Sequence, residues 1–375
     1  MSPTVGAYRL DPQYLGSSSP PRGVCLEDPR PGEAPRPEPG TANRSERYLA
    51  LVEPYQRPTP TRSILQVVGT LAGFLLLWYV MYRSLSASYA LALLLALPTA
   101  GLLVRLFIVQ HDCSHGSFFR SRRANRIIGR TCSLFTAVPY RYWQRFHALH
   151  HATSGKMDER GVADVVTLTV REFYDLGPWG RLKYRVYRNP LVLFVIGPTL
   201  HFVCLLRLPL IAPRNWRRER RSIWLTNLAL AGVFGSMSWL IGVEAVIKVH
   251  LPIVVIASSV GLWLFYVQHQ FEDGYWLPSE NWDYVDAALR GSSYLKLSPL
   301  LRWFTGSIGF HHIHHLSPRI PNYLLRECHE STPELQNVPT LGLREGFATM
   351  WLKLWDEDRE RLVSFREARR TIVVG

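Results

Sequence analysis

The chain has 375 residues, a net charge of +14 and an apolar fraction of 47%, and its apolar residues crowd into a few long uncharged blocks. The basic residues flank these blocks, which favours anionic lipid headgroups over nucleic acid as their partner; the sequence has no RRM, zinc-finger or helix-turn-helix signature. Its five cysteines are scattered and form no CxxC pair, which argues against a disulfide framework and against a cysteine zinc site.

The first segment, residues 1 to about 60, is rich in Pro, Gly, Ser and Arg and contains the stretch PRPGEAPRPEPGT. Such a composition buries too little apolar surface to offset the entropy of ordering, so we expect a disordered tail. The tail has no apolar core typical of a signal peptide, and its acidic residues argue against an organelle transit peptide.

Five apolar blocks follow, each long enough to be considered as a membrane span, because a bilayer core of about 30 Å needs about 20 helical residues. The blocks cover residues 64–82, 86–109, 191–212, 223–243 and 245–267. Five full crossings, however, would put the later histidines of the chain on the opposite side of the membrane from the earlier ones.

The basic residues resolve the topology. Residues 110–190 and the loop 214–221 are both rich in Arg or Lys, so the positive-inside rule places both in the cytosol. The block between them, which contains two prolines and an arginine, must then enter and leave on one side. We therefore predict an all-α integral membrane protein: four transmembrane helices as two hairpins, an interfacial or re-entrant segment at 191–212, and a helical cytoplasmic cap carrying a dinuclear metal site, with both termini in the cytosol.

The chain has thirteen histidines, and nine of them fall into three short motifs. The motifs are HDCSH at 111–115, HALHH at 147–151 and HHIHH at 311–315, and a further histidine, His269, follows the last apolar block. Histidines three or four residues apart share one face of a helix. One such pair is a weak signal, but three motifs at one membrane surface indicate metal binding. His201, His250 and His329 lie outside the motifs, where packing or local hydrogen bonding explains them.

Eight or nine imidazole ligands are too many for one tetrahedral ion and suit two ions of five or six coordination. The aqueous affinity order favours copper or zinc over iron at a nitrogen site, so the sequence does not fix the metal by affinity. Iron follows from the ligand count together with O₂ chemistry.

These motifs resemble those of the membrane fatty acid desaturase family. The order HxxxH, HxxHH, HxxHH and the extra histidine after the last span all match, over residues 64 to about 330. The phrases HDCSHGSFF, ALHHATSG, FYVQHQFED and GFHHIHHLSPRIPNY are most similar to bacterial acyl desaturases of the omega-6 or delta-12 type. We therefore expect a disordered tail over 1–60, a membrane desaturase domain with three histidine boxes over 61–335 and a cytoplasmic helical segment over 336–375.

The resemblance implies two iron ions and a set of ligands: His111, His115, His147, His150, His151, His269, His311, His314 and His315. Family members build a mushroom-shaped helical structure and remove two vicinal hydrogens from an acyl chain with O₂ and two electrons. Metal-bound histidines usually donate their other N–H to a carboxylate or carbonyl. The candidates for this orienting role are His312, Asp112, Asp158, Asp164, Glu272, Asp273 and Asn322.

The chemistry agrees with the resemblance, because an unactivated methylene has no acidic proton and no leaving group, and only a metal cofactor can supply the hard step. Several aromatic residues near the boxes either line an acyl tunnel or form an interfacial belt: Tyr142, Trp143, Trp263, Phe265, Tyr266 and Tyr275. No HPGG haem motif is fused to the chain, so we expect electrons from a separate acidic carrier, a ferredoxin with its reductase.

Three other functions compete with desaturation. A carotenoid ketolase or hydroxylase, or another lipid hydroxylase, could use the same boxes. An intramembrane zinc hydrolase would need fewer histidines and a carboxylate to activate water. A metal carrier would place its ligands near the bilayer midplane, whereas these boxes lie beside cytoplasmic segments. We expect the protein in the bacterial cytoplasmic membrane, with its metal site on the cytoplasmic side. No motif encodes the position of the double bond or the acyl carrier.

Overall fold

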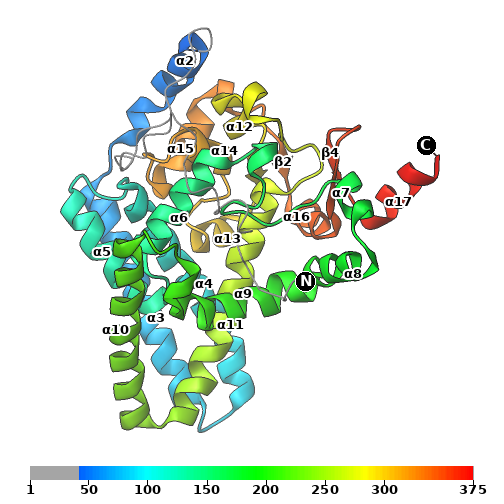
Figure 1. Cartoon of the computed structure of the whole chain (residues 1–375). Helices are drawn as coiled ribbons and strands as arrows, with labels where there is room; N and C mark the ends of the chain where they lie inside the picture. The colour runs from blue at the N-terminus through cyan, green and yellow to red at the C-terminus, as the bar shows by residue number, and fades with distance from the viewer. Residues whose placement is uncertain (1–41, 375) are drawn as a thin grey trace.

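The stem of the molecule consists of four long apolar helices that project from a cap of shorter elements (Figure 1). They are α3 (Pro60–Ser84), α4 (Tyr89–His115), α10 (Arg217–Ile241) and α11 (Val243–His269). The structure, a computed structural model, describes residues 42–374. All four helices are long and apolar enough to cross a membrane. Apolar side chains on their outer faces are open, with Leu228 72% and Trp239 85% exposed, as expected of surfaces that face lipid.

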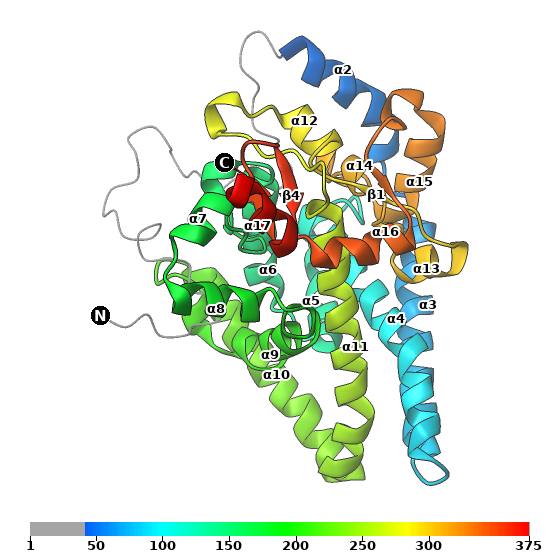
Figure 2. The ribbon, with the colours of Figure 1, turned by 90° about the vertical axis from the view of Figure 1, so that its right-hand side faces the viewer.

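The four helices pair as two hairpins, which confirms the predicted fold. Residues 85–88 join α3 to α4, and Gly242, with a φ of 86°, joins α10 to α11 within a single residue. A positive φ of this size is tolerated mainly by glycine, so the sharp turn depends on residue 242. Both turns lie at the far end of the stem from the cap (Figure 2).

The apolar block at 191–212 is broken rather than straight. It contains a π-helix η3 (Val192–Ile196), α9 (Gly197–Val203) and the 3-10 helices η4 (Leu205–Arg207) and η5 (Pro209–Ile211). Together with α8 (Pro178–Tyr187), the stretch Val192–Arg207 bends by 58°. The segment crosses the base of the cap in Figure 2, and its bend fits both the predicted interfacial or re-entrant segment and a broken span.

The cap contains short helices and two small sheets. Its helices are α5 (Arg122–Thr136), α6 (Tyr140–Thr153), α7 (Val170–Asp175), α12 (Tyr284–Leu289), α13 (Pro299–Phe304), α14 (His311–Leu316), α15 (Asn322–Ser331), α16 (Leu343–Ala348) and α17 (Phe365–Val374). The strand β1 (Tyr294–Leu295) pairs parallel with β2 (Thr340–Leu341), and β3 (Leu354–Asp356) pairs antiparallel with β4 (Arg361–Val363).

The ends of the chain contain more structure than the sequence suggested. Of the tail expected to be disordered, residues 1–41 lie outside the described part, but α2 (Ala42–Val52) and η1 (Glu53–Gln56) are helical. Disorder is therefore the wrong prediction for residues 42–56. The reason is that Val52 is fully buried in an apolar cluster with Leu324, and Arg44 forms an ion pair with Asp286 at 2.7 Å. Residues 336–375, expected to be helical, also contain the β3–β4 hairpin.

A buried polar network attaches the C-terminal segment to the cap end of α11. The fully buried Arg188 guanidinium donates to the Tyr266 hydroxyl at 2.8 Å and to the Leu352 carbonyl at 3.0 Å. The Lys353 ammonium in turn donates to the Arg188 carbonyl at 2.6 Å. These bonds fix residues 352–353 close to the last turn of α11.

The lengths of α4 and α11 bring their ends into the cap. Each has 27 residues and so rises about 40 Å, while the hydrocarbon core of a bilayer is about 30 Å thick. The turns at the far end of the stem mark one membrane face. The last two turns of each helix therefore emerge on the other face, among the cap helices.

Close packing between α5 and α6 sets the start of α6. A Cβ atom added at Gly129 would lie 2.2 Å from the Tyr140 ring. The same tyrosine donates its hydroxyl hydrogen to the Cys113 carbonyl at 2.7 Å, near the end of α4. Tyr140 thus fixes α6 to α4, and the missing side chain at position 129 makes room for it.

We expect Gly129→Ala to lower the free energy of unfolding by about 1–3 kcal/mol, because the new methyl group overlaps the Tyr140 ring. Thermal unfolding of the purified protein in detergent measures this change. The matched control is Gly232→Ala on α10, where a Cβ atom meets nothing within 4 Å. Equal unfolding midpoints for the two variants would contradict the packing argument.

Candidate metal centre

Nine buried or nearly buried histidines converge where the stem meets the cap. They form two groups. Cluster A consists of His111, His115, His147, His151 and His314, and cluster B consists of His150, His269, His311 and His315. Within each cluster, one ring nitrogen from every member lies within 4.8 Å of those of all the others. The structure thus brings together all nine residues that the sequence suggested as ligands.

Helical spacing explains how four short segments supply both clusters. The last turn of α4 gives His111 and His115 to cluster A, and Gly116, with a φ of 76°, ends the helix directly after them. The last residue of α11 is His269, in cluster B. The helices α6 and α14 each contribute to both clusters, because neighbouring positions on one helical face lie side by side.

The ring nitrogens in cluster A are in close contact. The Nε2 atom of His147 lies 2.8 Å from Nε2 of His111 and 3.1 Å from Nε2 of His151. The Nε2 atom of His151 is also 3.0 Å from Nε2 of His314. Nitrogens from three helices therefore face one small volume.

Cluster B repeats this arrangement. The Nε2 atom of His269 lies 3.1 Å from Nε2 of His150 and 2.9 Å from Nε2 of His311. The two clusters are adjacent, since the His151 and His315 rings stack with centroids 4.2 Å apart. The site is thus a pair of neighbouring nitrogen cages.

Hydrogen bonds orient two of these rings as they are usually oriented in metal sites. His111 directs Nδ1 at the Asp112 carboxylate at 3.0 Å, and His269 directs Nδ1 at the Gly291 carbonyl at 3.3 Å. Since these partners accept hydrogen bonds, Nδ1 donates a hydrogen in each ring, and Nε2 is the nitrogen left to face the cluster. A metal-binding histidine is usually oriented in this way, by a hydrogen bond from its other ring nitrogen.

Unpartnered nitrogens support the same conclusion. Among the described residues, the Nε2 atoms of His115 and His315 are buried without a hydrogen-bond partner, as are the Nδ1 atoms of His150 and His311. Buried polar atoms without partners are costly in folded proteins. Donors around an ion with metal–nitrogen distances of about 2 Å are at most about 4 Å apart, close to the 4.8 Å limit within each cluster. The histidine clusters can therefore hold metal.

The surroundings keep the cap histidines neutral, the form that binds metal. Burial lowers the pKa of each of these imidazoles well below its usual value, and repulsion from neighbouring imidazoles lowers it further. This applies to His147, His150, His151, His311, His314 and His315. The site is thus prepared for a cation rather than for protons.

A chain of hydrogen bonds holds His111 in its orientation. The second oxygen of Asp112 accepts from the Asn322 backbone N–H at 2.7 Å and from the Asn322 side-chain amide at 2.8 Å. Gln66 on α3 then donates to the Asn322 side-chain carbonyl at 3.1 Å. Two of the predicted orienting residues, Asp112 and Asn322, are therefore in place, and sequence reasoning missed Gln66. The only signal for it was a glutamine within an apolar block.

Two further glutamines beside the ligands were also missed. Gln110 donates to the Val138 carbonyl at 2.9 Å, which ties α4 to the loop before α6. Gln268 donates to the Ile308 carbonyl at 3.0 Å, which ties α11 to the loop before α14. Their signal in the sequence is a polar residue directly before His111 and His269 at the end of an apolar block.

The other candidate orienting residues have partners elsewhere. Asp158 accepts from the Ser279 N–H and hydroxyl, and Glu272 accepts from the Arg361 guanidinium at 2.7 Å. Asp164 accepts from its neighbour Val165, and burial raises its pKa to about 6. Asp273 is exposed. His312 is fully buried, and its Nε2 atom lies 3.3 Å from Nδ1 of His329.

Aromatic rings form part of the walls of the clusters. Trp143 stacks on His147 with centroids 5.0 Å apart, and Phe265 lies against His150 at 4.8 Å. The other rings suggested for a tunnel contact residues outside the clusters. Tyr142 stacks on Phe146, and Trp263 stacks on Phe347. Tyr266 and Tyr275 are hydrogen-bonded to Arg188 and to the Asp283 backbone. Trp143 and Phe265 are thus the two that border the site.

Four helices long enough to span a membrane and two histidine clusters that can hold metal define an integral membrane protein with a candidate metal centre. The chain belongs to the fatty acid desaturase family, whose sequence model, described as "Fatty acid desaturase", matches residues 84–342. The family assignment from the histidine boxes is therefore confirmed, and the protein is an oxidoreductase of lipid metabolism.

Several characterised desaturases are similar to the chain. A fatty acid desaturase of Bacillus subtilis (strain 168) is 43% identical over 325 residues, which cover 87% of this chain and 92% of the relative. An sn-1 acyl-lipid omega-3 desaturase (ferredoxin) of Synechocystis is 30% identical over 60% of this chain and 63% of its own length. An sn-1 oleoyl-lipid 12-desaturase of the same organism is 26% identical over 72% of this chain and 75% of its own.

We expect Asp112→Asn to weaken metal retention about 10- to 100-fold, because an amide in place of the second oxygen faces the two N–H donors of Asn322. Competition with a chelator, followed by metal analysis, measures the effect. The matched control is Asp158→Asn, which removes the same charge from a residue that binds Ser279. Equal retention by both variants would show that Asp112 does not support the site.

Proposed function

We propose that the nine histidines of clusters A and B hold two iron ions, and that the enzyme desaturates an acyl chain with O₂. The overall change converts two neighbouring methylenes, O₂, two electrons and two protons into a double bond and two waters. The observation that carries the proposal is the pair of adjacent cages with five and four converging nitrogens. One closed zinc site would use four ligands in all.

Iron supplies the oxidising power that removing hydrogen from an unactivated methylene requires. The protein contributes position and environment. The ends of α4 and α11 hold two edges of the site rigid, while α6 and α14 close it from the cap. Trp143 and Phe265 cover His147 and His150 and so exclude water from the reacting region.

The acyl chain of a membrane lipid is the substrate that this placement favours. The clusters lie where the stem enters the cap, within reach of the hydrocarbon, so a chain can reach them without crossing water. Two Synechocystis relatives are named as desaturases of acyl-lipid and oleoyl-lipid substrates, which supports the same class here.

An acidic electron carrier of the ferredoxin type suits the surface of the cap. Residues 116–136, which include α5, contain five exposed arginines and no aspartate or glutamate. Such a surface speeds the encounter with an acidic partner. The positive-inside rule assigns this basic side to the cytosol of a bacterial cell. One relative is named as ferredoxin-dependent.

The decisive test is expression in a host without polyunsaturated lipids, together with ferredoxin and its reductase. Fatty acid analysis that locates the double bond should reveal a new unsaturated product, and the purified enzyme should contain two irons per chain. A hydroxylated or oxygenated lipid in place of an alkene, or one zinc per chain, would overturn the proposal.

We expect His150→Ala and His314→Ala to abolish the product and to lower the iron content, since each removes a nitrogen from a different cluster. The matched control is His250→Gln. His250 lies on α11 against Phe234, away from the clusters, so this variant should keep both iron and product. Full activity in either alanine variant would contradict the ligand assignment.

A further inference from the structure

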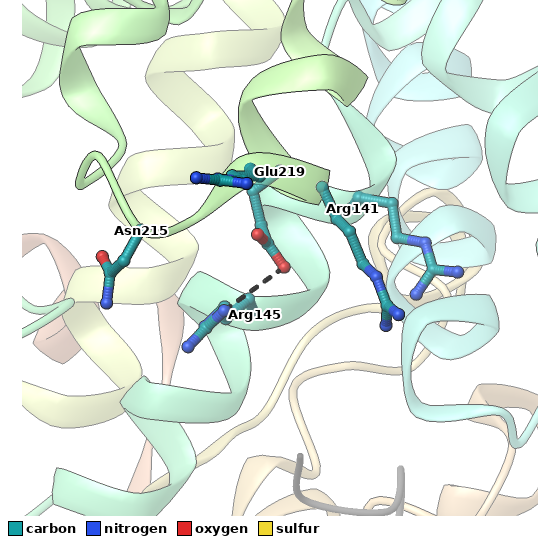
Figure 3. Close-up of a pocket in the computed structure, with 6 residues that line it drawn as sticks. Arg141, Arg145, Asn215 and Glu219 are labelled. Atoms are coloured by element: carbon teal, nitrogen blue, oxygen red, sulfur yellow. Dashed lines mark ion pairs between the residues drawn. The ribbon is translucent and has the colours of Figure 1, made fainter.

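A basic cavity lies between α6 and the beginning of α10, apart from the histidine clusters (Figure 3). Its volume is about 290 Å³. The residues that line it are Arg141, Arg145, Asn215, Arg217, Arg218 and Glu219. Two of the arginines are on α6, and the other two begin α10.

Positive charge dominates the lining. Four of the six lining residues are arginines and one is a carboxylate, so the lining is predominantly basic. That carboxylate, Glu219, is nearly buried, and its Oε1 atom lies 3.6 Å from a guanidinium nitrogen of Arg145. Figure 3 marks this ion pair with a dashed line. The Arg145 guanidinium also lies over the Trp216 ring, 4.4 Å from its centroid. Glu219 and Trp216 thus fix the position of the Arg145 guanidinium at the cavity. The basic lining favours the binding of an anion.

The chemistry of the lining suits a phosphate group. Guanidinium groups match phosphate oxygens with paired hydrogen bonds and are the usual choice for phosphate recognition. The first turn of α10 receives no side-chain cap, so the positive end of a 25-residue helix adds to the field of the arginines. A single helix terminus would be weak support, but here it reinforces a cavity with four arginines.

The depth of the cavity indicates where the phosphate comes from. The apolar part of α10, residues 223–241, has 19 residues and rises about 29 Å, which matches the hydrocarbon core. Arg217 and Arg218 precede it by five or six residues, or about 8–9 Å. The headgroup layer is about 5–8 Å thick on each side of the core, so the cavity lies at its level or just outside it.

We propose that this cavity binds the phosphate of an anionic phospholipid from the leaflet on the cap side of the membrane. The bound lipid bridges α6 and α10. Arg141 and Arg145 are four residues apart on one face of α6, and His147, His150 and His151 lie on the other. The lipid therefore fastens to the stem the same helix that supplies three histidines to the clusters.

An acidic protein is the competing occupant. A carrier protein binds a broad surface, whereas these arginines surround a concave site at the level of lipid headgroups. The exposed basic residues outside the cavity, Arg214 and Arg221, remain available to a protein partner. Lipid binding is thus expected to depend on the arginines of the cavity, and binding of an acidic protein on the exposed arginines outside it.

The test uses the full-length protein in nanodiscs of phosphatidylcholine with increasing phosphatidylglycerol. Thermal unfolding and binding of a spin-labelled phosphatidylglycerol are the two readouts. We expect saturable binding that raises the unfolding midpoint, and a loss of about tenfold or more in apparent affinity in Arg141→Gln/Arg217→Gln. The matched control, Arg214→Gln/Arg221→Gln, removes the same charge from exposed positions of the same basic side and should bind as the parent protein does.

Inorganic phosphate provides the second arm. Competition by millimolar phosphate, weakened in the same double variant, would support the phosphate chemistry and identify free phosphate as an alternative source. Equal lipid binding by both double variants would overturn the proposal. A second result would also overturn it: unchanged lipid binding in the cavity variant Arg141→Gln/Arg217→Gln, together with a raised KM for ferredoxin. That pair of results would assign the cavity to the electron carrier.

Discussion

The convergence of nine imidazoles in a buried site is the constraint on which the rest of the structure depends. One ring nitrogen from each of nine histidines faces one of two small volumes, and burial disfavours the protonated form of the cap imidazoles. Metal ions bound in the clusters would form bonds to these nitrogens. Because the nine histidines come from two stem helices and two cap helices, such binding would also connect the cap to the stem and stabilise the fold.

Two structural features set the position of these histidine nitrogens. The first is length, since α4 and α11 exceed the hydrocarbon thickness by about 10 Å and carry their terminal histidines out of the lipid. The second is a pair of glutamines, Gln110 and Gln268, that bond to the loops leading into α6 and α14. The membrane thus fixes the depth of the site, and these hydrogen bonds hold the cap helices α6 and α14 against the ends of α4 and α11.

The helix α6 shows how one short element serves two environments. Its histidine face completes the metal clusters, and its arginine face lines a basic cavity at the beginning of α10. An enzyme that acts on lipid at an interface needs both faces. Its reacting site must be dry and rigid, while its outer side faces charged headgroups. The clusters suit cations and the basic cavity suits an anion, and the width of one helix, about 10 Å, separates the two sites.

The sequence by itself determined the four spans, their pairing as hairpins and the three histidine boxes, because hydropathy and helical spacing are local periodic signals. Only the tertiary structure decided how nine histidines divide into groups of five and four, and that Asp112 rather than Asp158 contacts one of them. It also decided that Val52 docks α2 onto the cap. Asp112 meets Asn322 across 210 residues of chain, and Gln66 meets Asn322 across 256. No local pattern encodes such contacts, since they depend on how distant helices pack against one another.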